Sequence, residues 1–207
     1  MRCKQKRLRS NGMIKNINIV ENVFSNPNEI VDLAKKQTYY QCKEHPSYTD
    51  TFYQGYRTKN LSEILSEDSF RNIHMEIFNK LIINQEYNCS YEFNFVFDSF
   101  FHYLTEDNVY DKTWIHTDDD THNFLAGVIY LNENAPKSQG TKIFDNSGEV
   151  LIENVFNRGI MYNAIIPHSA ESGFGKDLSD SRLTLTIFVK KMFLEMSHPN
   201  LIFASIV

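Results

Sequence analysis

The sequence has few of the features that mark secreted, membrane-spanning or disordered proteins. Its 207 residues include only 3 Cys, 5 Pro and 8 Gly. The cysteines are odd in number and share no motif, so neither a disulfide framework nor a zinc knuckle is expected, and a reducing compartment is indicated. No apolar run approaches the roughly 20 residues of a membrane helix, and no apolar signal segment follows the charged N-terminus. We therefore expect a soluble, cytoplasmic protein without a membrane partner.

Basic charge is also scarce. The formal net charge is -5 at pH 7, and a nucleic-acid backbone favours a basic surface, so no nucleic-acid partner is expected. The one basic run, residues 2–9, is interpreted as a solvated tail. Aromatic residues are abundant instead, with 16 Phe and 11 Tyr, which is typical of a chain with a packed core.

The length suits one domain. We expect a flexible leader over residues 1–12, with Met13 as an alternative start to Met1, and a single domain over residues 13–207. Within that domain, the expected parts are a helical N-terminal part (13–88), a β core (89–192) and a C-terminal tail (193–207).

Hydrophobic periodicity predicts the elements. A short strand is expected over 14–20, a helix over about 27–38 that begins at Ser25-Asn26-Pro27, and a second helix over 70–82 that Ser66 or Asp68 could cap. From Tyr91 onward the period is two. The expected strands are 91–98, 100–104, 114–118, 124–131, 141–144, 150–156, 159–165 and 182–190. Helices followed by many short strands predict a mainly β (α+β) antiparallel sandwich or jelly roll, with the N-terminal helices packed on one sheet.

One stretch, residues 114–120, places a histidine and a carboxylate two positions apart. Residues i and i+2 of a strand share a face, so His116 and Asp118 could bind the same metal ion. His168, which follows Pro167 at the end of another strand, is the best candidate for a third ligand. Two His and one carboxylate with open positions opposite are the arrangement of non-haem Fe(II) oxygenases. A competing local site would combine His116 with Asp119, Asp120 and His122.

The last long strand predicts an anion site. Leu183, Leu185, Ile187 and Val189 form an apolar face, while Arg182, Thr184, Thr186 and Phe188 form the other face. A guanidinium that points into a cavity needs an anionic partner, because an unpaired buried charge is very costly. Its planar fork matches a carboxylate, and Thr184 could add a hydroxyl from the same face.

The chain order is His116-x-Asp118, then His168, then Arg182. With this order, the segment of about 91–190 resembles the double-stranded β-helix (jelly-roll, cupin-like) core of the Fe(II)/2-oxoglutarate-dependent dioxygenases. The resemblance is to the prolyl 4-hydroxylase-like branch, including small phage and bacterial oxygenases. Residues 127–132 resemble its "YLN" strand, and residues 139–144 resemble its "GG-T-x-F" stretch, with Gln139 where Gly is usual. Residues 55–58 resemble a short segment upstream of the core, and Tyr103 stands where a cosubstrate-contacting Tyr often occurs.

The resemblance implies a site and a reaction. His116, Asp118 and His168 would hold Fe(II), and the 2-oxoglutarate contacts would be Arg182, Thr184, Tyr130 and Tyr103. With O2, the protein would hydroxylate a C–H bond of a protein or peptide side chain or of an amino-acid-like substrate, and would release succinate and CO2. The gap from His168 to Arg182 is longer than usual, because residues 171–181 form an extended loop; Lys176 in that loop is the alternative cation.

Two alternatives stay open at this point. One is a cupin-like metal-dependent enzyme of another reaction class, and the other is a non-catalytic jelly-roll binding or structural module. The expected substrate pocket contains Tyr53, Tyr56, Arg57 and Trp114, with loops 48–56 and 171–181 as its walls. The sequence identifies neither the primary substrate nor the oligomeric state.

Overall fold

The computed structural model describes residues 17–46, 53–82, 91–108, 114–118, 125–145 and 148–196. Its elements, in chain order, are β1 (Ile17–Val20), α1 (Pro27–Lys35), β2 (Tyr40–Gln41), η1 (Cys42–Glu44), β3 (Tyr56–Arg57), α2 (Leu61–Ile64), α3 (Glu67–Ile77), η2 (Phe78–Ile82), β4 (Tyr91–Leu104), β5 (Leu125–Tyr130), β6 (Thr141–Asp145), β7 (Gly148–Ile152), β8 (Gly159–Asn163), β9 (His168–Ala170) and β10 (Arg182–Met196). The predicted mainly β chain with helices in its N-terminal part is confirmed.

The helices begin near the predicted signals. α1 starts at Pro27, whose missing N–H is harmless in a first turn, although the side chain of Asn26 makes no capping hydrogen bond. α3 starts after Ser66, whose hydroxyl accepts a hydrogen bond from the backbone N–H of Ser69. α1 ends at Lys35, earlier than the periodicity predicts, whereas α3 passes into the π-helical turn η2, which ends at Ile82, the predicted end of the second helix. In the described part of the chain, no helix is long and apolar enough to cross a membrane.

The strands form two antiparallel sheets. The large sheet has the order β1-β8-β5-β10-β4-β3-β2, and the small sheet has the order β7-β6-β9. His116 adds a further position to the small sheet through a bridge to His168. The chain therefore passes repeatedly between the sheets: β4, β5, β8 and β10 are in the large one, and His116, the hairpin of β6 and β7, and β9 are in the small one. This alternation closes a jelly roll, as predicted.

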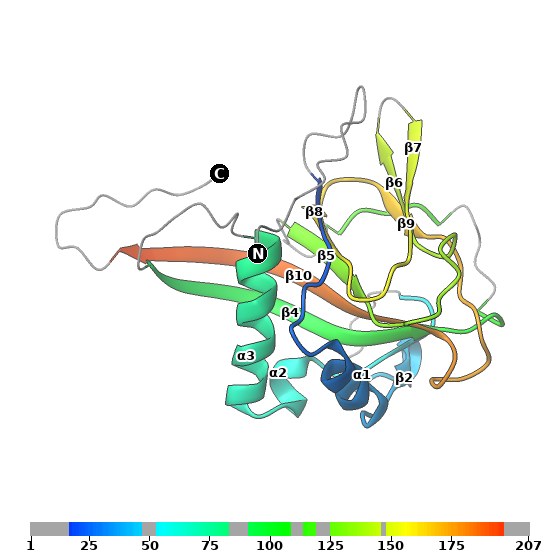
Figure 1. The fold of residues 1–207 in the computed structure, drawn as a ribbon, viewed down its shortest axis with the longest axis horizontal. Coiled ribbons are helices and arrows are strands. Elements are labelled where there is room, and N and C mark those ends of the chain that lie inside the picture. Colours follow the sequence, from blue (N-terminus) through cyan, green and yellow to red (C-terminus); the bar gives the residue numbers. More distant parts are fainter. Residues whose placement is uncertain are drawn as a thin grey trace.

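Two apolar cores lie on opposite faces of the large sheet. On one face, Leu183, Leu185, Ile187 and Val189 pack with helical residues such as Ile77, and Figure 1 shows helices α1–α3 along this side of the long strands. The second core lies between the sheets and contains Ala126, Ile143, Ile152, Ile160, Tyr162 and Ala164. The predicted division of β10 is thus confirmed, since alternate residues of a strand face opposite ways.

Some strands differ from the prediction. β4 is one strand of 14 residues rather than two, because its pairing with β10 runs unbroken on the β4 side from Leu104 to Tyr91. Segment 114–118 contributes only the bridge at His116 rather than a strand. The short elements β2, β3, β9 and α2 were not predicted, because two to four residues are too few to show a period.

Candidate metal centre

The structure brings His116, Asp118 and His168 together. Their ligand atoms all lie within 4.8 Å of one another. Nε2 of His168 is 3.2 Å from Oδ2 of Asp118, and Nε2 of His116 is 3.8 Å from Oδ1 of the same carboxylate. Backbone hydrogen bonds hold the two segments in this register: His116 and His168 exchange N–H···O bonds of 3.0 and 2.9 Å, and Asp118 N donates to Ala164 O.

Contacts around both imidazoles favour the neutral form that binds a metal. Nδ1 of His168 lies 3.0 Å from the carbonyl oxygen of Ile166. A carbonyl can only accept, so Nδ1 carries the proton, and in the neutral ring Nε2 is free to bind a metal. The ring of His116 stacks on Trp114 at 4.0 Å. Burial, followed by the neighbouring His168, lowers the pKa of His116, which favours the neutral form that metals bind.

The donor set fits a divalent transition metal. For metal–ligand bonds of about 2.1 Å, adjacent ligands of an octahedral ion are about 3 Å apart, and the separations to Asp118 of 3.2 and 3.8 Å are close to this value. Two imidazole nitrogens and a carboxylate match the facial triad of non-haem Fe(II) sites. No second group of three such ligands occurs among the described residues. The competing set, Asp119, Asp120 and His122, lies outside them.

Arg182 is a buried cation with neutral partners. Its side chain is at the start of β10, and the residue is 2% exposed. Nε donates to the carbonyl of Gln139 at 3.2 Å, and Nη2 donates to the carbonyl of Gly140 at 3.3 Å and to Oγ1 of Thr141 at 3.4 Å. Among the described residues, no carboxylate forms an ion pair with it. A buried guanidinium in this state is a ready site for an anion.

The guanidinium and the three candidate ligands belong to the same barrel interior. In the small sheet, Ile143 pairs with His168, and Thr141 pairs with Ala170. Thr141 also contacts Arg182. Residues two apart in a strand are about 7 Å apart. Thr141, which contacts Arg182, is therefore roughly 7 Å along the sheet from the pair of Ile143 and His168. Lys176, the alternative cation, is exposed.

Tyr130 and Thr184, two predicted cosubstrate contacts, lie beside this guanidinium. Tyr130 is fully buried, and its hydroxyl donates to Thr141 Oγ1 at 2.8 Å. Burial raises the pKa of Tyr130, so its hydroxyl keeps its proton. Thr184 is buried opposite Tyr130, but its hydroxyl donates to the backbone carbonyl of His102 at 3.3 Å.

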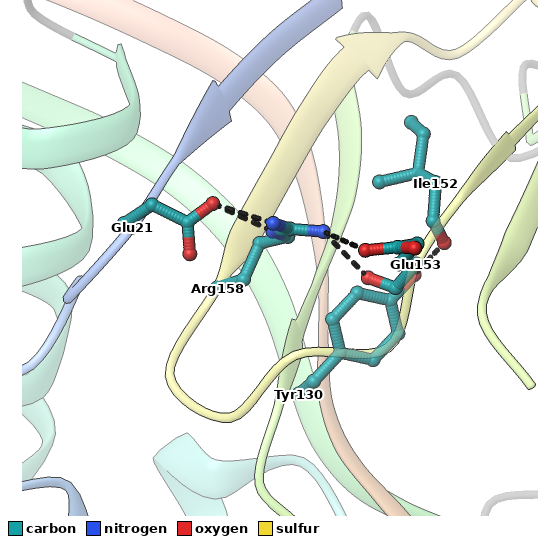
Figure 2. A network of polar contacts seen from close by, with 5 residues as sticks. All are labelled: Glu21, Tyr130, Ile152, Glu153 and Arg158. Carbon is teal, nitrogen blue, oxygen red and sulfur yellow. Dashed lines mark hydrogen bonds and ion pairs between the residues drawn. The ribbon is translucent and has the colours of Figure 1, made fainter. Parts of the chain in front are cut away.

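A polar network outside the barrel fixes the corner that carries Tyr130. Figure 2 shows Arg158 between Glu21 and Glu153: its Nε and Nη2 bind Glu21 Oε1 at 2.8 and 2.7 Å, and its Nη1 donates to the carbonyl of Glu153 at 3.0 Å. The Tyr130 hydroxyl also lies 3.4 Å from the carbonyl of Ile152. The backbone N–H of Tyr130 donates to the carbonyl of Arg158, so this network holds the end of β5 in place.

Two features that sequence reasoning missed position Arg182. The amide of Asn132 accepts from Leu183 N at 2.7 Å and donates to Ser181 O at 2.7 Å, which fixes the start of β10. The sequence shows Asn132 directly after a strand, as the last residue of the stretch that resembles the "YLN" strand, but does not reveal this capping role. The second feature is Gln139, which offers its carbonyl to Arg182 and whose side chain binds the hydroxyl of Ser172.

The extended loop 171–181 packs at the Arg182 end. Glu171 N donates to Gly140 O at 3.1 Å, and Glu106 N donates to Gly175 O at 2.8 Å. Gly173 lies so close to β4 that a Cβ there would be 2.1 Å from the carbonyl oxygen of Thr105. The loop therefore covers the arginine end of the barrel, and its expected contact with the primary substrate stays a prediction.

Tyr103 and Tyr56 are not brought to the site. Cross-strand partners share a face of a sheet, and Tyr103 pairs with Leu183, so it lies on the helix-covered face. There its ring stacks on Tyr56 at 4.6 Å. The residue of β4 that faces inward is His102, which pairs with Thr184. Burial, together with the charges of Arg57 and Arg182, lowers the pKa of His102 to about 3.

The other predicted pocket residues lie closer to the barrel interior. Arg57 pairs with His102 across β3 and β4, and its Cζ lies 4.3 Å from the centroid of the Tyr53 ring. Tyr53 is 8% exposed and donates its hydroxyl to Tyr40 O at 3.0 Å. Trp114 covers the ring of His116. The expected aromatic loop 48–56 is described only from Tyr53 onward.

Comparisons with known proteins support the fold. No protein-family model matches the chain, and no curated protein matches it. Among solved structures, the chain is similar to the non-haem α-ketoglutarate-dependent epimerase SnoN from nogalamycin biosynthesis, with a TM-score of 0.55 and 12% identity over 84% of this chain and 77% of that one. It is also similar to a Pseudomonas putida prolyl-4-hydroxylase, with a TM-score of 0.48 and 16% identity over 84% of this chain and 91% of that one. The likeness to SnoN confirms the predicted resemblance at the level of the fold.

Proposed function

We propose that this protein is an Fe(II)- and 2-oxoglutarate-dependent oxygenase. The observation that supports this most directly is the combination, inside one barrel, of a His-Asp-His group with a buried arginine that has only neutral partners in the described chain. A metal site alone would suit many enzymes. A metal site next to an unneutralised guanidinium suits a ligand that chelates a metal at one end and carries a carboxylate at the other.

In this proposal His116, Asp118 and His168 hold the metal. When bound, Fe(II) would supply the oxidative chemistry, with 2-oxoglutarate and O2 consumed and succinate and CO2 released. Arg182 binds the distal carboxylate of the cosubstrate, and its burial excludes water from that ion pair. Tyr130 and Thr141 form the neighbouring wall, and Thr184 lies on the same face of β10 as Arg182.

For the outcome of the reaction, we propose hydroxylation of a C–H bond in a protein or peptide side chain or in an amino-acid-like substrate. The sequence resemblance to the prolyl 4-hydroxylase-like branch supports this choice. The fold itself does not discriminate, because the structurally similar SnoN is an epimerase, and one fold hosts many reactions. Product analysis, rather than structure, decides between hydroxylation and another oxidation.

The proposal is tested by spectroscopy without oxygen. Purified protein with Fe(II) and 2-oxoglutarate should develop the visible charge-transfer band of the chelate, and His116→Ala and Asp118→Ala should abolish it. Asp32→Ala, which removes an exposed carboxylate of α1, is the matched control and should keep the band. A parent protein whose spectrum does not change would refute the proposal.

A succinate assay then separates the remaining alternatives. Oxygen-dependent succinate formation from 2-oxoglutarate is expected of the oxygenase. A cupin-like enzyme of another class would bind the metal but form no succinate. A non-catalytic jelly-roll module would keep its binding function in the His116→Ala/His168→Ala double variant.

A further inference from the structure

We infer that Arg57 binds a carboxylate of the primary substrate, so that the protein acts on an anionic substrate. This inference rests on the proposed function, because it assigns Arg57 to the molecule that is oxidised and Arg182 to the cosubstrate. The two guanidiniums share one interior face but occupy different positions along it.

Strand pairing places Arg57 on the interior face. Arg57 pairs with His102, and His102 pairs with Thr184. Because cross-strand partners share a face, Arg57 lies on the same side of the large sheet as Thr184 and Arg182. Its neighbour Tyr56 lies on the opposite side, stacked on Tyr103.

Three aromatic rings hold the guanidinium. Its Cζ lies 4.3 Å from the ring centroid of Tyr53, 5.0 Å from that of Phe100 and 5.7 Å from that of Phe188. A guanidinium held against ring faces keeps its charge and donates in its own plane. The rings therefore restrict the side chain before any ligand binds, which reduces the entropy lost on binding.

The backbone around Arg57 is fixed as well. Nε2 of His102 forms a hydrogen bond of 2.5 Å with the carbonyl of Gln54. Gly55 has a φ of 73°, and a Cβ at that position would be 2.5 Å from the carbonyl oxygen of Tyr103. The segment that carries Arg57 is thus tightly packed on β4.

The candidate metal ligands lie near the aromatic rings around Arg57. Phe188 pairs with Ala126, and Ala126 pairs with Tyr162, whose ring contacts His168 with centroids 4.8 Å apart. Phe188, one of the three rings around Arg57, therefore lies in the same cross-strand row as Tyr162, the residue that contacts His168. Arg182 is six positions from Phe188 along β10, and its guanidinium contacts Thr141, which lies two positions from the strand partner of His168. A cosubstrate between Arg182 and the metal would leave Arg57 to face the molecule that is oxidised.

The charges around Arg57 suit a carboxylate. Arg57 pairs with His102 across β3 and β4, and its charge contributes to the lowered pKa of His102. A substrate carboxylate would bind through charge-assisted hydrogen bonds, which neutral analogues cannot match.

The experiment uses the only tryptophan of the chain as the reporter. Trp114 stacks on His116, so its fluorescence should respond to ligands near the metal group. The protein is first saturated with Mn(II) and 2-oxoglutarate, which fills the Arg182 site, and is then titrated with benzoate and with its neutral isostere benzamide. A second pair, acetyl-Gly-Glu-Gly-amide and its Gln counterpart, tests whether the carboxylate comes from a small acid or from a peptide side chain.

The acid of at least one pair should bind at least tenfold more tightly than its amide. Arg57→Gln should lose this preference, Arg57→Lys should keep part of it, and the exposed-residue control Arg71→Gln should retain it fully. Retained stabilisation by 2-oxoglutarate shows that each variant is folded and loaded. If the parent is not stabilised by 2-oxoglutarate, the proposed function fails. If the loaded parent binds neither acid, does not discriminate between acid and amide, or keeps its preference in Arg57→Gln, the inference about Arg57 is wrong while the proposed function stands.

Discussion

Replacing Arg182 by Met should separate ligand binding from folding. Arg182 is 2% exposed, and the three described hydrogen bonds of its guanidinium, at 3.2 to 3.4 Å, go to neutral acceptors. Three such bonds contribute about 3 kcal/mol in total at roughly 1 kcal/mol each. Burying an unpaired ion costs several kcal/mol. These terms nearly cancel, so the variant without ligand should be as stable as the parent within about 1 kcal/mol, or more stable.

Binding of 2-oxoglutarate should respond very differently. At a concentration of 100 times Kd, a ligand stabilises the folded parent by about 2.7 kcal/mol, which is roughly 5–10 °C in Tm for a domain of this size. Loss of two charge-assisted hydrogen bonds, at about 1.5 kcal/mol or more each, weakens binding at least about a hundredfold. At the same concentration the variant then gains only about 0.4 kcal/mol, or roughly 1 °C.

Thermal unfolding of the Mn(II)-loaded protein, with and without 2-oxoglutarate, measures both effects. Lys176→Met, which removes the exposed alternative cation, should behave like the parent. The reasoning is refuted if Arg182→Met keeps the full ligand-induced shift, or if it loses more than about 3 kcal/mol without ligand. The second result would make the guanidinium a structural element.

Three further predictions concern residues around the site and in the helical layer. Tyr130→Phe should weaken 2-oxoglutarate binding severalfold in calorimetry, because it removes a hydroxyl beside Arg182, whereas Tyr103→Phe on the opposite face should not change it. Asn132→Ala should lower the free energy of unfolding by about 1–3 kcal/mol, since Leu183 N loses its acceptor, and the exposed control Asn134→Ala should be neutral in urea unfolding. Burial lowers the pKa of His74 to about 4, so the unfolded chain binds more protons between pH 6.5 and 4. Stability should therefore fall with decreasing pH in that window, by up to about 1.4 kcal/mol per pH unit from this residue, and urea unfolding of His74→Gln should show a smaller slope.

Local patterns predicted the parts of the site that depend on one strand or one short stretch. His116 and Asp118 share a face because they are two positions apart. The apolar and polar faces of β10 follow from the same alternation, and the order His-x-Asp, His, Arg identified His168 and Arg182. The structure places the ligand atoms of the first three within 4.8 Å and buries Arg182 in the same barrel.

The prediction that Tyr103 contacts the cosubstrate shows what local patterns cannot decide. Alternation in residues 100–104 says that His102 and Tyr103 face opposite ways, but it does not say which of them faces inward. The pairing of His102 with Thr184 and of Tyr103 with Leu183 decides this, and a shift of one residue would exchange them. The capping hydrogen bonds of Asn132 and the contact of Gln139 with Ser172 join segments far apart in the chain, and no local pattern encodes them.

The sequence by itself determined the mainly β class, the layer of helices on one sheet, the candidate metal ligands, and the arginine that could bind a carboxylate. These follow from periodicity and from the chemistry of side chains, which are properties of short stretches. Only the tertiary structure decided which face of β4 enters the barrel, that loop 171–181 covers the Arg182 end, and that Arg57 lies among Tyr53, Phe100 and Phe188. The physical reason is that these features depend on the register between strands, and register is set by packing of the whole sheet rather than by the residues of one strand.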